Sequence, residues 1–460
     1  MDEEPFLEER GKPLPIETLP RDELEKLQNR RLRYTVRMAY ETTKFYYELF
    51  NSLKMSPEDI KSREDLNKSF EKGLRLTPEM LINFYEDLLP SYVKNNEVAW
   101  VEVQTGGFSG NPKKVRYTIP PTLSNDVVTL AYNAGKLFEG DRILLALAPY
   151  PYSSGLLVTY GMKNYIYKVS FDPEWTTETR RPLLTEEIID KIRKFNPTYF
   201  TTSPSTALEV ADEMIRKGLE PSDTDIRTIL VGGEASEKEK KDKISKRWDA
   251  EVFDAWAASE ASIFGYECSN HDGMHIAESR VLISVANPEM DDILGKGEEG
   301  KSIITTLYDT GEKPGIFLVN YCLGDITRIL DEKGECKCGR TFIKVDYPKR
   351  DDETINIRSV KLYARDPERA LSVKDYVTIE KYSKSKGIKR LEIRIVPEEE
   401  YKKEHIIEEV WDALLSSNPE AYKLLKGDDI IFNIVPPEKL YEGLEVPRGK
   451  KKRLFRKTED

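Results

Sequence analysis

Histidine is scarce in this chain, and its scarcity narrows the chemistry that the protein can perform. Only His271, His275 and His405 occur among 460 residues, and the first two lie near a cysteine. No Gly-x-Ser-x-Gly sequence is present, which argues against a hydrolase built on a Ser-His-Asp triad. We therefore do not expect general-base catalysis by histidine.

Cysteine and long apolar segments are also lacking. Four cysteines in 460 residues do not make a disulfide framework, which favours a reducing compartment. No apolar run reaches the roughly 20 residues that a membrane span needs. The acidic, polar residues 1–10 match neither a secretory signal nor a transit peptide. We expect a cytoplasmic protein that does not engage a membrane.

Positive charge is in deficit. The 71 lysines and arginines are outnumbered by 82 aspartates and glutamates, which gives a net charge of −11. This balance argues against a general nucleic-acid binder. The exception is the basic tail at residues 448–457, which by itself indicates either a solvated chain end or a nucleic-acid patch.

The length and apolar content of the chain suffice for more than one domain. Between residues 98 and 330, strand-like apolar runs alternate with helical segments, which predicts an α/β domain with mainly parallel sheets. Near residue 350 a charged, proline-containing stretch indicates a linker, so we expect domains at 1–350 and 351–460, the second small and α+β. The expected strands are 98–103, 115–119, 143–147, 198–201, 228–231, 251–253, 391–396 and 430–435, and the expected helices are 18–50, 205–217, 237–248, 366–371 and 405–416.

A glycine-rich run at residues 104–114 (QTGGFSGNPKK) stands between two of the expected strands. Backbone amides in such a turn can approach an anion closely, and neighbouring hydroxyl and lysine side chains can add to a phosphate cradle. The run is not a Walker sequence, because no Gly-Lys-Ser/Thr follows and no helix opens behind it. Its spacing alone also fits a glycine hairpin that binds nothing.

Four further segments follow in order. Residues 231–236 (VGGEAS) end an apolar strand in paired glycines, a common place for a ligand in a parallel sheet. Residues 254–260 (DAWAASE) contain the carboxylates Asp254 and Glu260, and residues 320–326 (NYCLGDI) contain a single carboxylate, Asp325. The fourth segment is the tail, residues 447–453 (PRGKKKR).

Together these segments resemble the adenylate-forming (acyl-activating) superfamily, in its branch of phenylacetate–CoA ligases and coenzyme F390 synthetases. The family's phosphate loop matches residues 105–113, its Tyr-Gly-x-x-Glu motif matches 256–260, its Tyr-Arg-Thr-Gly-Asp motif matches 321–325, and its Gly-Lys-x-x-Arg ending lies within 447–453. The branch also has Glu-Cys, Gly-x-His and Cys-Gly-Arg, which are present here at 267–268, 273–275 and 338–340.

The resemblance implies a large nucleotide- and acid-binding domain, a mobile C-terminal lid, and ATP with Mg²⁺. Glu260 would hold Mg²⁺, Asp325 would accept hydrogen bonds from ribose, and Lys450 would reach the α-phosphate from the lid. Asp351 would be the hinge, and Tyr150 and Tyr152 would line the acid pocket. The remaining nucleotide-binding positions would be Thr105, Gly106, Gly107, Ser109, Gly110, Lys113, Gly233, Glu234, Ala235, Asp254, Trp256, Ser259, Lys349 and Arg350.

Three departures from the family pattern bear on this interpretation. At the hinge, either Lys349 stands where the family has its ribose-contacting arginine or Arg350 has taken that role, and lysine is not equivalent to arginine at a bidentate site. Gly107 and Phe108 replace two hydroxyl residues of the phosphate loop, which removes hydrogen-bond donors. Residues 256–257 are Trp-Ala where the family has Tyr-Gly, so the adenine or acyl pocket is reshaped.

Cys268, His275, Cys336 and Cys338 could form a tetrahedral Cys₃His zinc site. His271 competes with His275 for the nitrogen position. With four ligands filled, such a site would be structural. The alternative is a set of small buried residues and a surface histidine; Cys322 is expected to be a buried filler.

The resemblance implies an acid–CoA ligase that works through an acyl-adenylate, with a small carboxylic acid, ATP and CoA as its partners and a homodimer as its assembly. Two alternatives stay open. One is an adenylyltransferase of the F390 synthetase type, which would move AMP onto a deazaflavin hydroxyl. The other is a non-catalytic or carrier-directed relative, suggested by the thinned phosphate loop.

Overall fold

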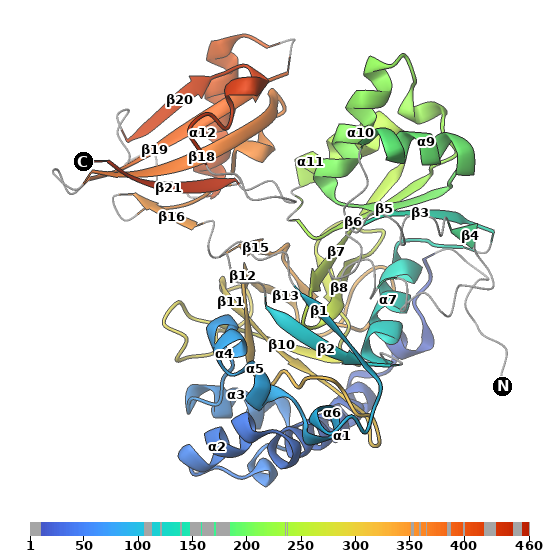
Figure 1. Ribbon diagram of the computed structural model, residues 1–460, viewed down its shortest axis with the longest axis vertical. Helices are drawn as coiled ribbons and strands as arrows, with labels where there is room; N and C mark the ends of the chain where they lie inside the picture. The colour runs from blue at the N-terminus through green and yellow to red at the C-terminus, as the bar shows by residue number, and fades with distance from the viewer. Residues whose placement is uncertain are drawn as a thin grey trace. The chain divides into compact units, whose positions relative to one another are not determined.

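A computed structural model gives the protein's structure (Figure 1). It describes residues 11–104, 113–119, 122–138, 140–147, 158, 170–171, 185–234, 236, 238–350, 354–357, 360–364, 366–383, 388–398, 401–417, 429–444 and 453–459. The chain forms two compact units, Met1–Ser236 with Ile244–Pro348, and Glu237–Lys243 with Lys349–Asp460. No helix within these ranges is long and apolar enough to cross a bilayer.

One long helix and several short ones open the first unit and lead into a hairpin. Apolar residues at helical spacing, including Leu24, Leu32 and Val36, are buried on one side of the first helix. Thr43 ends this helix and caps the next one, because its side chain accepts a hydrogen bond from the Tyr46 amide. The elements are α1 (Arg21–Thr42), α2 (Lys44–Ser52), α3 (Arg63–Glu71), α4 (Pro78–Asn83), α5 (Tyr85–Leu88), α6 (Ser91–Lys94) and the antiparallel hairpin β1 (Trp100–Gln104) and β2 (Lys114–Thr118).

A nine-stranded sheet forms the centre of the first unit, in the order β13-β14-β9-β8-β7-β6-β5-β3-β4. Pairing is parallel from β4 to β7 and antiparallel from β7 to β13. The predicted α/β class is confirmed, and the reversal at β7 is a feature that the alternating pattern did not indicate. The strands are β3 (Arg142–Ala146), β4 (Ser170–Phe171), β5 (Tyr199–Thr202), β6 (Thr228–Gly232), β7 (Glu251–Ala258), β8 (Ser262–Glu267), β9 (Met274–Ile276), β13 (Ile329–Asp331) and β14 (Lys344–Val345).

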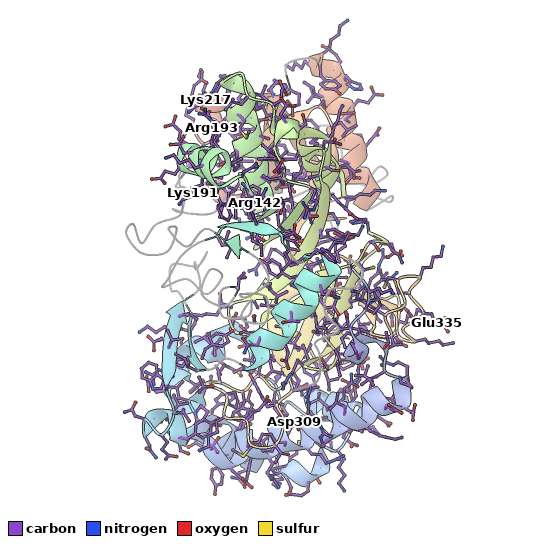
Figure 2. All side chains as sticks on the ribbon, turned by 90° about the vertical axis from the view of Figure 1, so that its right-hand side faces the viewer. Arg142, Lys191, Arg193, Lys217, Asp309 and Glu335 are labelled. Carbon is purple, nitrogen blue, oxygen red and sulfur yellow. The ribbon has the colours of Figure 1, made fainter. Side chains whose placement is uncertain are left out.

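Both faces of the parallel part are covered, as the near-continuous apolar strands require. Alternate residues serve the two faces: Leu144 and Phe200 pack with α9 (Thr185–Phe195) and α10 (Pro204–Arg216), whereas Ile143 and Tyr199 pack with α7 (Thr122–Ala134). Figure 2 shows Lys191, Arg193 and Lys217 at the outer side of the α9–α10 layer, away from this core. The helix α11 (Lys238–Trp248) contributes Ile244 and Trp248 to the same face.

A second sheet in the first unit contains β10 (Val281–Ala286), β11 (Gly300–Thr306) and β12 (Tyr321–Thr327), paired antiparallel. Its residues share one apolar core with the N-terminal helices, through contacts among Tyr46, Phe317 and Tyr321 and their neighbours. This sheet is what brings the motif at residues 320–326 beside the central sheet.

The second unit is an α+β body with its own core, which includes Tyr376, Leu391, Ile393 and Val410. Its sheet order is β20-β19-β18-β21, with β18 and β19 antiparallel and both outer pairs parallel. The helix expected at 366–371 is a 3₁₀ turn, Asp366–Arg369. The elements are β15 (Lys349–Arg350), β16 (Thr354–Ile357), β17 (Val360–Tyr363), β18 (Val373–Ser383), β19 (Ile388–Pro397), α12 (Lys403–Ser417), β20 (Ile430–Ile434) and β21 (Leu454–Glu459).

Candidate active site

Glu260 is the centre of a buried polar cluster in the first unit. It lies in the tight turn between β7 and β8, where Ala258 pairs with Ser262, and its side chain is 2% exposed. The Lys113 ammonium forms an ion pair with Glu260 Oε1. The Tyr321 hydroxyl donates to the same oxygen at 2.6 Å, and Lys113 Nζ donates to that hydroxyl at 3.2 Å. The fold thus joins the end of the glycine-rich run, the β7–β8 turn and the start of β12 at one carboxylate.

The charge state of this cluster follows from its contacts. Burial alone would raise the pKa of Glu260, but the Lys113 ammonium and the hydrogen bonds from Lys113 and Tyr321 outweigh burial and hold the pKa below its usual range. Burial and the Glu260 charge raise the pKa of Tyr321 far above its usual value, so Tyr321 remains a donor. An ionised carboxylate is the oxygen ligand that Mg²⁺ prefers, so Glu260 fits the metal role that the resemblance implies.

Asp325 is held by an aromatic side chain from the neighbouring sheet. Trp256 Nε1 donates to Asp325 Oδ2 at 2.9 Å. A register shift between Trp256 and Ala257 interrupts the β7–β8 ladder, and such irregularities re-aim side chains. Gly324, at φ +81°, provides the left-handed conformation immediately before Asp325. The tryptophan that replaces the family's tyrosine therefore orients the expected ribose-binding carboxylate.

The paired glycines lie at the carboxyl end of the parallel strand β6. A Cβ on Gly232 would come within 2.9 Å of the Ala255 carbonyl oxygen, so glycine is required for the close approach of β6 to β7. Gly233 follows at φ +80°. Glu234 then accepts a hydrogen bond from Ser205 Oγ at 2.6 Å. This edge is the location where open parallel sheets bind ligands.

Ser259 and Asp254, also expected to bind nucleotide, have backbone roles in this site. The Ser259 carbonyl accepts a hydrogen bond from the Tyr117 hydroxyl at 2.7 Å, which ties the residue before Glu260 to β2. Asp254 is buried on β7, and its amide donates to Glu267 Oε2 at 2.9 Å. The roles of Tyr117 and Tyr321 are not evident from the sequence, because a hydroxyl contact between distant segments leaves no periodic signal.

The other predicted site residues are two that begin the second unit and a group that lies outside the described residues. Lys349 and Arg350 form β15, at the point where the chain re-enters the second unit. The following predicted site residues lie outside the described residues: Thr105, Gly106, Gly107, Ser109, Gly110, Tyr150, Tyr152, Ala235, Asp351 and Lys450.

The structure brings Cys268, His275, Cys336 and Cys338 together, with their four ligand atoms all within 4.8 Å of one another. Cys338 Sγ lies 3.4 Å from His275 Nε2, and Cys268 Sγ lies 3.9 Å from Cys336 Sγ. His275 Nδ1 is 3.0 Å from the Phe342 carbonyl oxygen. That contact suits an Nδ1–H donor and leaves the Nε2 lone pair directed at the cysteines, as in metal-binding histidines.

The turn around Gly339 and the contacts of His271 both support His275 as the nitrogen ligand. Gly339, at φ +86°, closes a turn in which its amide donates to the Cys336 carbonyl at 3.0 Å. His271 is engaged elsewhere: its Nδ1 lies 3.3 Å from Glu267 Oε1 and its Nε2 lies 3.4 Å from Glu251 Oε1. The donor set of three sulfurs and one imidazole is typical of a closed, structural zinc site.

Comparisons with known proteins show what the chain resembles in sequence and in fold. No family model matches the chain. Phenylacetate–coenzyme A ligase from Aromatoleum evansii is 28% identical over 361 residues, which cover 76% of this chain and 75% of the relative. The enzyme of the same name from Thermus thermophilus is 26% identical and covers 77% of each.

Among solved structures, 2-hydroxyisobutyryl-CoA ligase in its postadenylation state, in complex with R3-HIB-AMP, superposes with a TM-score of 0.77 at 17% identity, covering 96% of this chain and 91% of that one. This similarity supports the fold, and the relatives above support the branch. The chain is therefore similar in sequence to phenylacetate–coenzyme A ligases and shares the fold of a CoA ligase that forms an acyl-adenylate.

Proposed function

We propose that the protein activates a carboxylic acid with ATP as an acyl-adenylate and then transfers the acyl group to CoA. The observation that carries the proposal is Glu260, a buried and ionised carboxylate that contacts the lysine at the end of the glycine-rich run. The relatives named phenylacetate–coenzyme A ligase support the choice of reaction.

In the first half-reaction a carboxylate oxygen of the acid attacks the α-phosphorus of ATP, and the bond to pyrophosphate breaks. Charge develops on phosphoryl oxygens, so positioned cations and amides carry the catalysis. Mg²⁺ held by Glu260 would neutralise phosphate charge when bound. Asp325 would accept hydrogen bonds from the ribose hydroxyls, and Gly233 and Glu234 would border the adenine.

In the second half-reaction the CoA thiolate attacks the acyl carbonyl, a thioester forms, and AMP leaves with the electrons of the acyl–phosphate bond. We assign residues 1–350 to nucleotide and acid binding and residues 351–460 to a lid that carries Lys450. The lysine would supply a point charge to the α-phosphate and the carboxylate during adenylation.

Turnover assays test this function. Pyrophosphate and AMP release would be measured with ATP and Mg²⁺ against aryl, aliphatic and hydroxylated acids and a deazaflavin, each with and without CoA. We expect acid-dependent pyrophosphate release and CoA-dependent formation of an acyl-CoA. Pyrophosphate release with the deazaflavin alone would make the protein an adenylyltransferase instead. No pyrophosphate release with any acceptor would contradict both the ligase and the adenylyltransferase.

The lysine assignment has a matched control in the same basic tail. Lys450→Ala should reduce adenylation at least about a hundredfold, the loss expected for a group that stabilises transition-state charge, while ATP binding is retained. Lys451→Ala should adenylate at close to the wild-type rate. Unchanged adenylation in Lys450→Ala would remove this lysine from the mechanism.

We also propose that the Cys₃His cluster binds a structural zinc ion. Cys268, His275, Cys336 and Cys338 would fill a tetrahedral shell, so no coordination position would be left for a substrate. The ion's contribution would be to hold the segment around Cys336–Arg340 against β9.

A further inference from the structure

The contact between Lys113 and Glu260 raises a conflict that the proposed function alone does not settle. Glu260 Oε1 already accepts the Lys113 ammonium and the Tyr321 hydroxyl. The same carboxylate is the one assigned to Mg²⁺. Two cations at one oxygen repel each other strongly in a site with little solvent, so Lys113 and Mg²⁺ compete for Oε1.

Burial explains why Glu260 is more stable with a cation beside it. The Glu260 side chain is 2% exposed, whereas that of Lys113 is 21% exposed. A carboxylate without a counter-charge at such a depth is strongly unfavourable. The lysine approaches from the more open side, at the end of the glycine-rich run, so it is the partner with room to move.

We propose that Lys113 is a placeholder cation, which keeps Glu260 charged and oriented before substrate binds and competes with Mg²⁺ for it. The inference rests on the proposed function, in which Glu260 serves Mg·ATP. When Mg²⁺ takes the carboxylate, the ammonium is released toward the phosphate oxygens that arrive with the metal.

Tyr321 is the constant partner in this exchange. It is fully buried and donates to Glu260 Oε1 from a neutral hydroxyl. A neutral donor does not repel Mg²⁺, so it can keep the carboxylate in one orientation with either cation. Tyr321 is therefore a positioning residue that acts through Glu260.

The experiment uses the full-length protein with Mg²⁺ alone, without ATP, acid or CoA. Thermal unfolding would be followed in MgCl₂ and in NaCl of matched ionic strength, for wild type, Lys113→Met and Lys114→Met. Lys114 is the matched control, because it is adjacent and 55% exposed and pairs with Glu102 at 3.4 Å. We expect Lys113→Met to melt several degrees lower than wild type in NaCl and to recover most of that loss in MgCl₂.

Wild type and Lys114→Met should show little specific response to Mg²⁺. Titration calorimetry with MgCl₂ gives a second readout: removal of the competing ammonium should tighten Mg²⁺ binding at least about tenfold. If Lys113→Met does not fold in NaCl, we expect to recover it as soluble protein only when MgCl₂ is present, and that result would also support the proposal. The double variant Lys113→Met/Glu260→Gln should fold in either salt and lose the response.

Two outcomes would overturn the proposal. One is a Lys113→Met protein as stable as wild type in NaCl. The other is a loss of stability that Mg²⁺ does not restore, or restores equally in Lys114→Met. Because no substrate is present, a protein inactive with every acid in the turnover assays could still show the expected exchange, so the two failures are distinguishable.

Discussion

Arg340 Nε donates to Glu17 Oε1 at 2.6 Å, and both side chains are buried although 323 residues separate them in the chain. The Tyr266 hydroxyl donates to the same oxygen at 2.5 Å, and the Leu14 amide donates to Glu17 Oε2 at 2.8 Å. Arg340 follows the cysteine cluster by two residues. The pair therefore fastens the N-terminal segment to the turn that the cluster organises.

Breaking this pair should destabilise the first unit. Arg340→Met leaves Glu17 buried and charged without its partner, which costs about 3–5 kcal/mol in comparable cases. Urea denaturation monitored by tryptophan fluorescence would measure the loss. The exposed neighbour Lys337 provides the control variant, Lys337→Met, for which we expect no measurable change.

A double variant separates the lost pair from lost packing. Glu17→Gln/Arg340→Met removes both charges, so it should recover part of the stability lost in Arg340→Met. If the double variant instead loses as much stability as the two single variants lose together, the side chains do not act as a pair.

Removal of zinc from the Cys₃His cluster should destabilise the turn that precedes Arg340. Purified protein should contain about one zinc ion per chain, and Cys338→Ser should contain none and melt at a lower temperature. Cys322→Ala is the control, because Cys322 is buried on β12 and outside the cluster. Less than about half an equivalent of zinc in the wild type, or equal zinc in both variants, would contradict the assignment.

Individual strands show which parts of the fold could be predicted from the sequence. The apolar runs near residues 143, 198 and 228 predicted β3, β5 and β6, because a strand buried on both faces has a local signature. The two-residue strand β14 has none, since Lys344 and Val345 form a strand only by pairing with β9 and β13. The antiparallel half of the sheet depends on such long-range pairing.

The candidate site divides in the same way. Glu260 and Asp325 were predicted from motif order, and Cys268, His275, Cys336 and Cys338 from ligand type and spacing. The choice between His275 and His271 depended on which ring faces the cysteines, which spacing does not determine. Tyr321 donates to a residue 61 positions away, and its role required the structure.

Trp256 gives a prediction about nucleotide affinity. Trp256→Phe keeps an aromatic ring on β7 but removes the hydrogen bond to Asp325 Oδ2. A hydrogen bond to a charged group contributes about 1.5–3 kcal/mol, so the KM for ATP should rise at least about tenfold while kcat changes less. Steady-state kinetics with saturating acid would measure both constants.

Trp100→Phe is the matched control for that variant. Trp100 lies on β1, and its Nε1 donates to the exposed Asn96 side chain at 3.2 Å. We expect its KM for ATP to stay near the wild-type value. An equal rise in both variants would indicate a general loss of structure instead of a lost contact to Asp325.

Glu392 in the second unit predicts a pH dependence of stability. Burial alone would raise its pKa, but hydrogen bonds from Arg394, Lys381 and Asn433 lower it to about 2. Arg394 Nε and Lys381 Nζ each lie 2.8 Å from one of its oxygens. Because the folded-state pKa is depressed, the stabilisation is complete above the unfolded value of about 4.3 and is lost as the pH falls toward 2.

Glu392→Gln should therefore cost about 1–2 kcal/mol near neutral pH, after allowance for solvent screening. The difference from wild type should shrink as the pH falls from about 4.3 toward 2, because Glu392 then becomes protonated and both proteins carry an uncharged group at this position. Melting temperatures across this range, with Glu404→Gln at the exposed start of α12 as the control, would measure the change. A difference that stays constant with pH would show that the stabilisation by Glu392 does not come from its charge.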